Sequence, residues 1–388
     1  MKATGLAELP LHDGHVPPWM AQYMKKLLKA IIAVIVEEYG PIEVVKRLSN
    51  PYWFQALNNA IGMDWDSSGS TTVLTGLLRQ VAQENPDLGI VVLGGKGRLA
   101  RMVPEQARML ASQGLLEKPE EIVEASRIAA KTDNTLLQDG YTIYHHTVIA
   151  DQEAKLWCIV QQGMNIERRM ARRYHWLGPL QGDPTLEPHT GIAGVVEENI
   201  IDLTSRKSLE ARKTILDLAR ENPRRTLRLI GEAYRALKRI KPLTTWIPGA
   251  REKDTAKLIA VYKPQKTPPI KTIEKTLQKI YEQNPQTIRE LVLIEGVGPT
   301  TIRSLALVAE LVYNTPVSHQ DPVNTPLDPF RYTYIVGGKD GIPYPYDTKT
   351  AREVIEFLEE AVRRAKLGDK EKLRTLKRLR NLLKTTTT

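Results

Sequence analysis

The sequence predicts a mixed α/β (α+β) amino-terminal domain of catalytic type with a central β-hairpin, followed by an all-α domain. Two apolar runs, 141–150 and 156–160, are rich in β-branched and aromatic residues and flank a polar turn, as in a hairpin. A third run, 89–93, is typical of a buried strand. Beyond residue 203 the apolar residues recur at helical spacing, which predicts helices.

The chain has 388 residues, enough for two or three domains. With 26% charged and 41% hydrophobic residues, it has the composition of a soluble globular protein. No apolar run approaches the ~20 residues that a bilayer span requires, and no signal peptide is recognised, so we expect no membrane association. The one cysteine, Cys158, excludes an intramolecular disulfide and a thiolate metal cluster. These features predict a cytoplasmic protein.

Charge and composition divide the chain into three parts: an α/β domain over 1–200, a basic helical region with a linker over 201–269, and a helical domain over 270–388. The stretch 201–290 holds 21 Lys or Arg against 10 Asp or Glu, a net charge of +11, while the whole chain carries +10. A basic face of this kind favours a polyanion, and nucleic acid is the commonest one. The alternative is an ordinary solvated surface.

Helices are predicted over 20–39, 42–48, 51–57 and 73–83, the first of them stopped by Gly40-Pro41. The strand 89–93 ends in Gly94-Gly95-Lys96-Gly97-Arg98. Because glycine lets the backbone approach closely, we predict that Lys96 and Arg98 bind phosphate. The segment does not match the Walker pattern, so nucleotide hydrolysis is not indicated.

Polar side chains gather around the predicted hairpin, and they form the candidate catalytic set. Burying them without partners is costly, so a purely structural role must supply partners for all of them. We expect His145 or His146 to act as base or nucleophile, with Asp139 as its orienter. Cationic and amide side chains would stabilise phosphorane charge or bind substrate. These are Arg172, Arg173 and Lys131, and Gln161, Gln162 and His175.

Alternation along a strand sends adjacent side chains to opposite faces. His145 and His146 should therefore differ in role, one catalytic and one structural. The competing interpretation of the whole set is a hydrogen-bonded polar layer inside the fold.

A second signature lies at 293–305, where one helix ends, a Gly296-Val297-Gly298 turn follows, and another helix begins. It resembles a helix-hairpin-helix motif, whose backbone amides grip a DNA phosphate without reading bases. Residues at this turn and one basic residue farther on, in a repeat of the Gly-Gly-Lys element at 337–341, are predicted to bind DNA. They are Gly296, Gly298, Thr300, Thr301, Arg303 and Lys339. A purely structural helix turn is the alternative.

Helix-hairpin-helix DNA glycosylases carry an Asp downstream of this motif, and Asp321 lies at about that distance. The residues after Asp321 depart from the glycosylase pattern, and Thr300 stands where a lyase would place lysine. The resemblance therefore implies DNA binding more than base excision.

Several segments together resemble an archaeal and bacterial family with a domain of unknown function and a carboxy-terminal helix-hairpin-helix. They are 53–57, 94–97, 138–141, 161–165, 172–176 and 337–341. A fainter resemblance, to phospholipase-D-type nucleases, involves His145-His146, Asp151 and Gly163-Met164-Asn165. Thr147 or Val148 stands where that pattern requires lysine.

We therefore expect a DNA-acting enzyme, a phosphodiester-cleaving nuclease of DNA repair or processing. The alternatives are a DNA glycosylase or lyase, with Asp139 or Asp321 as its carboxylate, and a DNA-binding protein without chemistry. A divalent metal, Mg²⁺ or Mn²⁺, could serve the nuclease. The sequence leaves the metal site, the choice between DNA and RNA, and the oligomeric state open.

Overall fold

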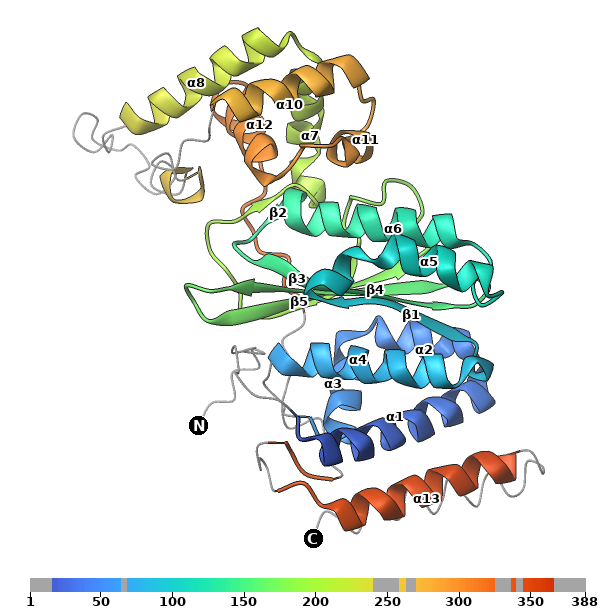
Figure 1. Ribbon diagram of the computed structural model, residues 1–388. Coiled ribbons are helices and arrows are strands. Elements are labelled where there is room, and N and C mark those ends of the chain that lie inside the picture. Colours follow the sequence, from blue (N-terminus) through green and yellow to red (C-terminus); the bar gives the residue numbers. More distant parts are fainter. Residues whose placement is uncertain are drawn as a thin grey trace.

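A five-stranded antiparallel sheet lies between two helical layers, with a cluster of helices at one end of the molecule (Figure 1). The computed structural model describes residues 16–63, 68–239, 258–262, 270–324, 336–339 and 345–365. The sheet has the order β1-β3-β4-β5-β6. Its strands are β1 (Ile90–Lys96), β3 (Thr142–Asp151), β4 (Trp157–Asn165), β5 (Met170–Gly178) and β6 (His189–Ala193).

The predicted hairpin is confirmed as β3 and β4, which pair in antiparallel register from Thr142↔Met164 to Ala150↔Trp157. Asp151 shapes the turn between them, because its carboxylate accepts hydrogen bonds from the amides of Glu153, Lys155 and Leu156. An Asp side chain that binds the amides following it favours a tight turn. Strand β5 then adds to β4, with Gln162 opposite Arg173.

One face of the sheet packs against the amino-terminal helices. They are α1 (Pro18–Tyr39), α2 (Pro41–Leu48), α3 (Pro51–Ala60) and α4 (Ser68–Glu84). Pro41 stands at the first position of α2, where its missing N–H costs no hydrogen bond. The core here joins apolar side chains of α1, α2 and α4 to Ile149, Cys158 and Val160 of the sheet.

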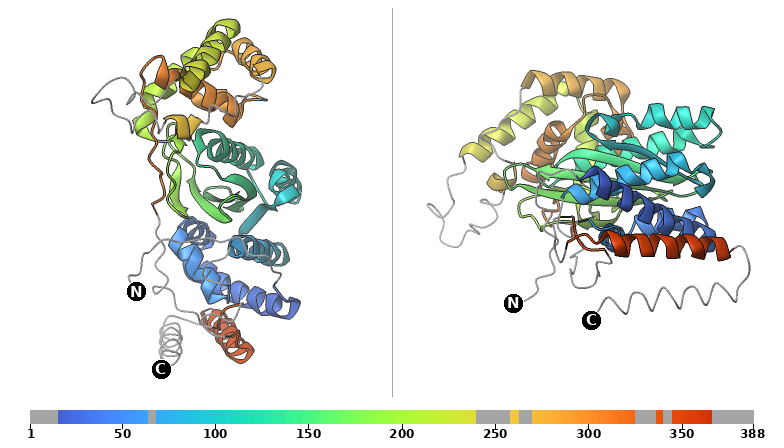
Figure 2. Two further views of the ribbon diagram at one scale, coloured as in Figure 1. Left: turned by 90° about the vertical axis from the view of Figure 1, so that its left-hand side faces the viewer. Right: turned by 60° about the horizontal axis from the view of Figure 1, so that its bottom comes forward.

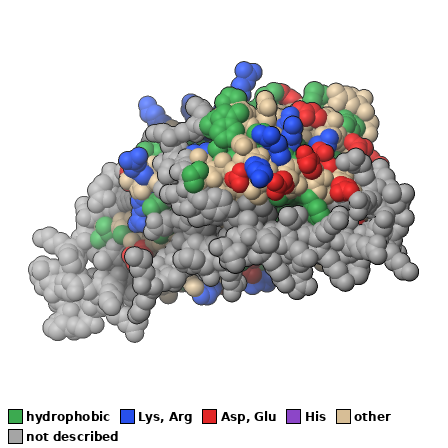
Figure 3. Space-filling view, turned by 90° about the horizontal axis from the view of Figure 1, so that it is seen from below, with side chains coloured by type: hydrophobic (Ala, Val, Ile, Leu, Met, Phe, Trp, Pro, Cys, Tyr) green, Lys and Arg blue, Asp and Glu red, His purple; other side chains and the backbone are tan. Residues whose placement is uncertain are grey.

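The last described helix, α13 (Thr348–Ala365), packs on the outer side of α1. Ala351 and Ile355 join the same apolar core as α1. Viewed from below, the described part of this end of the molecule presents interspersed basic, acidic and apolar side chains (Figure 3).

Helices α5 (Val103–Ser112) and α6 (Pro119–Lys131) cover the other face of the sheet. Their core includes Leu93, Val148, Ile159 and Trp176. Helix α6 continues into a π-helical turn, η3 (Thr132–Leu136), and then into the short strand β2 (Leu137–Gln138). Strand β2 pairs with β7 (Ile201–Asp202).

The helical cluster lies at the end of the molecule opposite α13 (Figure 2). It comprises α7 (Leu209–Arg220), α8 (Pro223–Arg239), α10 (Ile270–Gln283), α11 (Ile288–Leu293) and α12 (Pro299–Leu311). One apolar core joins all five helices, and Leu136, Ile201 and Leu203 extend it toward the sheet.

This packing confirms the mixed α/β class but divides the chain differently from the prediction. Helices α7 and α8, predicted as a separate basic region, share their core with α10–α12. Helix α13, predicted within the last domain, packs on α1. Most of the predicted linker lies outside the described residues, although Val261 and Tyr262 are buried in the helical core. Over the described ranges, no helix is long and apolar enough to cross a membrane.

Candidate active site

The two adjacent histidines of β3 face opposite sides of the sheet, as the alternation predicts. His145 Nε2 is hydrogen-bonded to the hydroxyls of Thr75 in α4, at 3.0 Å, and Thr147, at 2.9 Å. His146 Nε2 is hydrogen-bonded to Ser126 of α6 at 2.8 Å. Both side chains are buried. The hairpin therefore divides the polar set into two layers, one on each face.

The layer beneath α3 and α4 is fully buried. Arg173 donates to His175 Nε2 at 3.0 Å and to Gln55 at 3.3 Å, and its guanidinium lies 4.5 Å from the Phe54 ring centroid. Gln162 donates to the Ser68 carbonyl at 2.8 Å and is hydrogen-bonded to Thr71 and Tyr144. Since every one of these groups has protein partners, this layer is the hydrogen-bonded polar layer of the alternative interpretation.

Burial controls the protonation of the histidines in both layers. It lowers the pKa of His145 to about 3, with small additional effects of His146 and Lys96, and it lowers the pKa of His146 and of His175 as well. Burial also lowers the pKa of Arg173, which donates to three neutral groups, His175, Thr71 and Gln55. The three imidazoles are therefore neutral at pH 7.

Arg172 lies on the other face of β5, in a buried ion pair with two carboxylates. It donates to Asp139 at 2.8 Å and to Asp321 at 3.2 and 2.6 Å. Although burial by itself lowers it, the pKa of Arg172 is raised by these carboxylates. The prediction that Asp139 orients a histidine is wrong, because Asp139 binds Arg172 and Tyr174 instead. Asp321 also accepts the amide of Glu197, so this ion pair joins β5 to the segment after α12.

Lys131 also has a different neighbourhood from the one predicted. Its ammonium group donates to the Val297 carbonyl at 2.7 Å, in the turn between α11 and α12. Partial burial lowers its pKa. Lys131 thus supports that turn and does not lie with the histidines.

The layer beneath α6 is a hydrogen-bonded series that runs from the core toward the surface. Ser126 donates to His146, whose Nδ1 lies 2.8 Å from Gln161 Oε1, and Gln161 Nε2 donates to Asp133 Oδ2 at 2.5 Å. Asp133 Oδ2 also accepts from Trp176 at 2.9 Å, and Asp133 Oδ1 lies 2.6 Å from Nε2 of His189. The π-helical turn at the end of α6 carries Asp133 into this position, in keeping with the frequent occurrence of such turns at functional sites.

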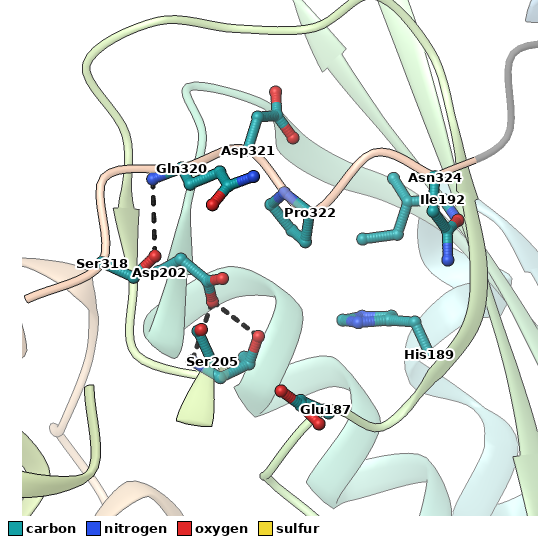
Figure 4. A pocket seen from close by; sticks show the side chains of 11 residues that line it. Glu187, His189, Ile192, Asp202, Ser205, Ser318, Gln320, Asp321, Pro322 and Asn324 are labelled. Carbon is teal, nitrogen blue, oxygen red and sulfur yellow. Dashed lines mark hydrogen bonds between the residues drawn. The ribbon is translucent and has the colours of Figure 1, made fainter. Parts of the chain in front are cut away.

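The series ends in a cleft of about 280 Å³, and His189 projects into it (Figure 4). The imidazole is 6% exposed and lies against Tyr174 and Trp176. Because a carboxylate only accepts hydrogen bonds, Nε2 of His189 carries the proton toward Asp133, and in the neutral imidazole Nδ1 holds the lone pair. Among the described residues, none is hydrogen-bonded to Nδ1. An oriented imidazole with a free lone pair is suited to general-base chemistry.

The opposite wall of the cleft is rich in hydrogen-bond acceptors. Asp202 and Ser205 face the cavity from the side opposite His189, with Ser318 and Gln320 beside them (Figure 4). Asp202 Oδ1 accepts from the amide and hydroxyl of Thr204, at 2.9 and 2.6 Å, and burial raises the pKa of Asp202.

Two cations flank the cleft on the turn η4 (Arg206–Ser208). Arg206 pairs with Glu187 at 2.8 Å, and Lys207 donates to Gln320 at 2.7 Å. Glu187 and Gln320 both line the cleft. The cleft therefore has an acidic interior and a basic rim.

The turn between α11 and α12 places the predicted DNA-binding residues unequally. Gly296 and Thr300 are exposed and Gly298 is half-buried, whereas Thr301 is buried. Arg303 donates to Gln138 at 2.8 Å, and burial lowers its pKa. Only Gly296, Gly298 and Thr300 are thus presented at the turn. Gly296 has φ +91°, in the left-handed region that favours glycine.

The glycine-rich end of β1 has a structural explanation. A side chain at Gly94 would lie 2.2 Å from the His146 carbonyl, so only glycine fits beside β3. Lys96, the last residue of β1, and Arg98, which follows it, are exposed. Lys339 is half-buried, and residues 340–344 of the second Gly-Gly-Lys element lie outside the described part.

The phospholipase-D-type arrangement is not assembled here. Asp151 shapes the turn at one end of the hairpin, and Asn165 accepts the amide of Arg168 at the other end of β4. Residues at opposite ends of a strand cannot share one catalytic centre. No group of three His, Cys, Asp or Glu side chains within the described ranges could hold a metal ion.

Sequence reasoning missed most of the cleft. His189 was not among the predicted catalytic residues, and Asp133 follows a helix without any motif. Asp202 and Ser205 come from a short strand and its following turn. A signal was nevertheless present, because Asp133 and His189 each lie three residues before an apolar residue that proves to be buried, Leu136 and Ile192.

Comparison with known proteins gives one match. A family described as "Protein of unknown function (DUF763)" matches residues 5–346. No curated protein and no solved structure matches the chain.

Proposed function

Since the chain belongs to the DUF763 family, whose description assigns no chemistry, we propose from its own site that it is a DNA-processing phosphodiesterase. In this proposal the α11–α12 turn binds the DNA backbone, and the cleft carries the chemistry. The observation that carries it is the Asp133–His189 pair, whose imidazole projects into the cleft (Figure 4).

The turn supports backbone binding as a helix-hairpin-helix would. Gly298 precedes α12, whose first-turn amides have no acceptor within the helix. A side chain built on Gly298 meets no atom within 4 Å, so the turn leaves room for a close phosphate. Exposed cations on α8 and α10, Arg224, Arg228, Lys271 and Lys275, would add sequence-independent attraction.

In the cleft, His189 would act as general base. Its Nδ1 would take a proton from water as the water oxygen bonds to phosphorus and the ester P–O bond to the leaving sugar oxygen breaks. Asp133 would hold the ring and stabilise the imidazolium, which then returns the proton to the leaving oxygen. Arg206 and Lys207 at the rim would bind the phosphodiester and offset the charge that develops on it. This assignment replaces His145 and His146, which are buried among protein partners.

Base excision is the second candidate, and the acidic interior favours it. Asp202 lies on the cleft wall, where a carboxylate could stabilise a cationic sugar. The carboxylates predicted for this reaction, Asp139 and Asp321, are both engaged by Arg172. Asp202 would take their place.

One screen separates these functions. The purified protein is incubated with single-stranded, duplex, branched and lesion-containing DNA and with RNA, with and without Mg²⁺ or Mn²⁺. Strand cleavage without prior base loss supports the phosphodiesterase, and abasic sites support base excision. Binding to every DNA without any product would leave only the binding-protein alternative.

A further inference from the structure

We propose that the cleft takes a single unstacked nucleotide, with its base against the acceptor-rich wall and its phosphate at the basic rim. This inference rests on the proposed function and deepens it, because it names the substrate as a nucleotide outside a base-paired stack. The residues that would bind this nucleotide are His189, Asp202, Ser205 and Gln320 in the cleft and Arg206 and Lys207 at its rim.

Size is the first argument. Ligand pockets span ~300–1,000 Å³, so a cleft of about 280 Å³ lies at the small end. A duplex cannot enter such a cavity, whereas one base with its sugar suits it. Enzymes that act on a nucleotide inside DNA commonly extrude it into a pocket of this kind.

Charge is the second argument, and it orients the ligand. The interior holds Asp202, which is 2% exposed, so a phosphate there would meet a carboxylate. Arg206 and Lys207 lie on the rim, bonded to the cleft residues Glu187 and Gln320. Glu187 offsets the charge of Arg206, whereas Lys207 binds the neutral Gln320, so the phosphate belongs at the rim beside Lys207.

Hydrogen-bonding capacity is the third argument. The inner wall offers the Asp202 carboxylate and the Ser205 and Ser318 hydroxyls (Figure 4). The imidazole of His189, a side chain more than nine-tenths buried, projects into the cavity from the opposite side (Figure 4). Acceptors select ligands with N–H donors, and the exocyclic amino groups of cytosine and adenine are such donors. Thymine has no amino group and should bind less well.

The test uses the full-length protein and isothermal titration with dCMP, dAMP, dTMP and deoxycytidine. We expect dCMP and dAMP to bind at least about tenfold more tightly than dTMP, a difference of roughly 1.4 kcal/mol. Deoxycytidine should bind more weakly than dCMP because it lacks the phosphate. Equal affinity for all four, or no binding up to millimolar concentrations, would overturn the proposal.

Two variants and a matched control locate the ligand. Asp202→Asn keeps the Oδ1 acceptor that Thr204 uses and removes the charge, so it should lower dCMP affinity at least about tenfold. Lys207→Ala should reduce dCMP affinity to that of deoxycytidine while leaving deoxycytidine binding unchanged. Glu210→Gln, an exposed carboxylate on α7 that pairs with Lys213, serves as control and should bind like the parent. If Asp202→Asn and Lys207→Ala also bind like the parent, the nucleotide lies elsewhere.

The outcomes separate the inference from the proposed function. If the protein binds nucleotides through Asp202 but acts on no nucleic acid, the nucleotide site is supported and the proposed phosphodiesterase activity is contradicted. If the protein cleaves DNA but binds no mononucleotide, the phosphodiesterase activity is supported and the nucleotide site is contradicted.

Discussion

Asp133 and His189 form a buried pair in which Oδ1 of the carboxylate lies 2.6 Å from Nε2 of the imidazole. The other carboxylate oxygen accepts from Trp176 and Gln161. Both oxygens are therefore fixed, and they hold the ring, which projects into the cleft (Figure 4). The pair connects the buried polar hairpin to the cavity in which we place the chemistry.

The buried charge of Arg172 should be important for stability. Arg172→Met would leave Asp139 and Asp321 buried without their cation, at a cost of about 3–5 kcal/mol. Arg225→Met removes an Arg whose side chain is 57% exposed and pairs with the exposed Glu221, and should cost less than about 1 kcal/mol. Urea unfolding measures both, and equal midpoints for the two variants would contradict the role of this ion pair.

Acid should destabilise the fold through its neutral histidines. Burial lowers the pKa of His145, His146 and His175, so the unfolded chain binds these protons first. Stability should therefore be full above pH ~6.5, the ordinary histidine pKa, and should fall as the pH drops below it. For His145 the loss continues down to its folded-state pKa of about 3. Each such histidine contributes up to about 1.4 kcal/mol per pH unit.

His145→Gln isolates one of these contributions. Its free energy of unfolding, measured in urea between pH 7 and pH 4.5, should decline less steeply than that of the parent. Buried carboxylates such as Asp202 act in the opposite direction in both proteins, so the difference between the two slopes reports on His145 alone. Parallel slopes would show that His145 takes up a proton in the folded protein as readily as in the unfolded chain.

The α11–α12 turn should contribute to DNA affinity. Gly298 is the position at which this can be tested without disturbing the fold. This residue has φ −146° and open space around it, so Gly298→Ala should fold normally. The added methyl group should obstruct a phosphate, and we expect duplex affinity to fall by roughly tenfold, about 1.4 kcal/mol. Gly231→Ala on α8, another glycine with open space around it, is the control.

Salt should weaken DNA binding steeply, because each neutralised phosphate adds about −0.9 to the slope of log affinity against log salt concentration. Fluorescence anisotropy between 50 and 200 mM salt, roughly the range over which such contacts are lost, measures the slope. Affinity that stayed constant would remove the basic helices from the interface.

Local patterns predicted much of the fold. Alternating β-branched residues located β3 and β4, and proline and glycine located the ends of α1 and α2. The adjacent histidines could be assigned to opposite faces from the strand period alone. The partners of the polar residues could not be predicted, because they come from distant segments. Arg172, for example, pairs with Asp321, 149 positions away.

The cleft could not be predicted from the sequence for the same reason. Its walls come from β6, from the turn after β7 and from the segment after α12, and these meet only in the folded chain. Clustered polar residues in the sequence indicated chemistry at the hairpin, but there the side chains bond to one another within the core, and Nδ1 of His145, which has no hydrogen-bond partner among the described residues, is buried. The side chain that remains available, His189, lies at the end of that network.

Single-turnover cleavage by His189→Gln, beside the parent and His146→Gln, tests the central claim most directly. It uses the substrate that the screen identifies, at saturating concentration, with affinity measured on the same preparations. We predict that His189→Gln binds DNA like the parent and loses at least ~100-fold in rate, the usual contribution of a general base. His146→Gln, which lies behind Gln161, should lose much less. Cleavage by His189→Gln at the parental rate would contradict the claim that the Asp133–His189 pair is the catalytic centre.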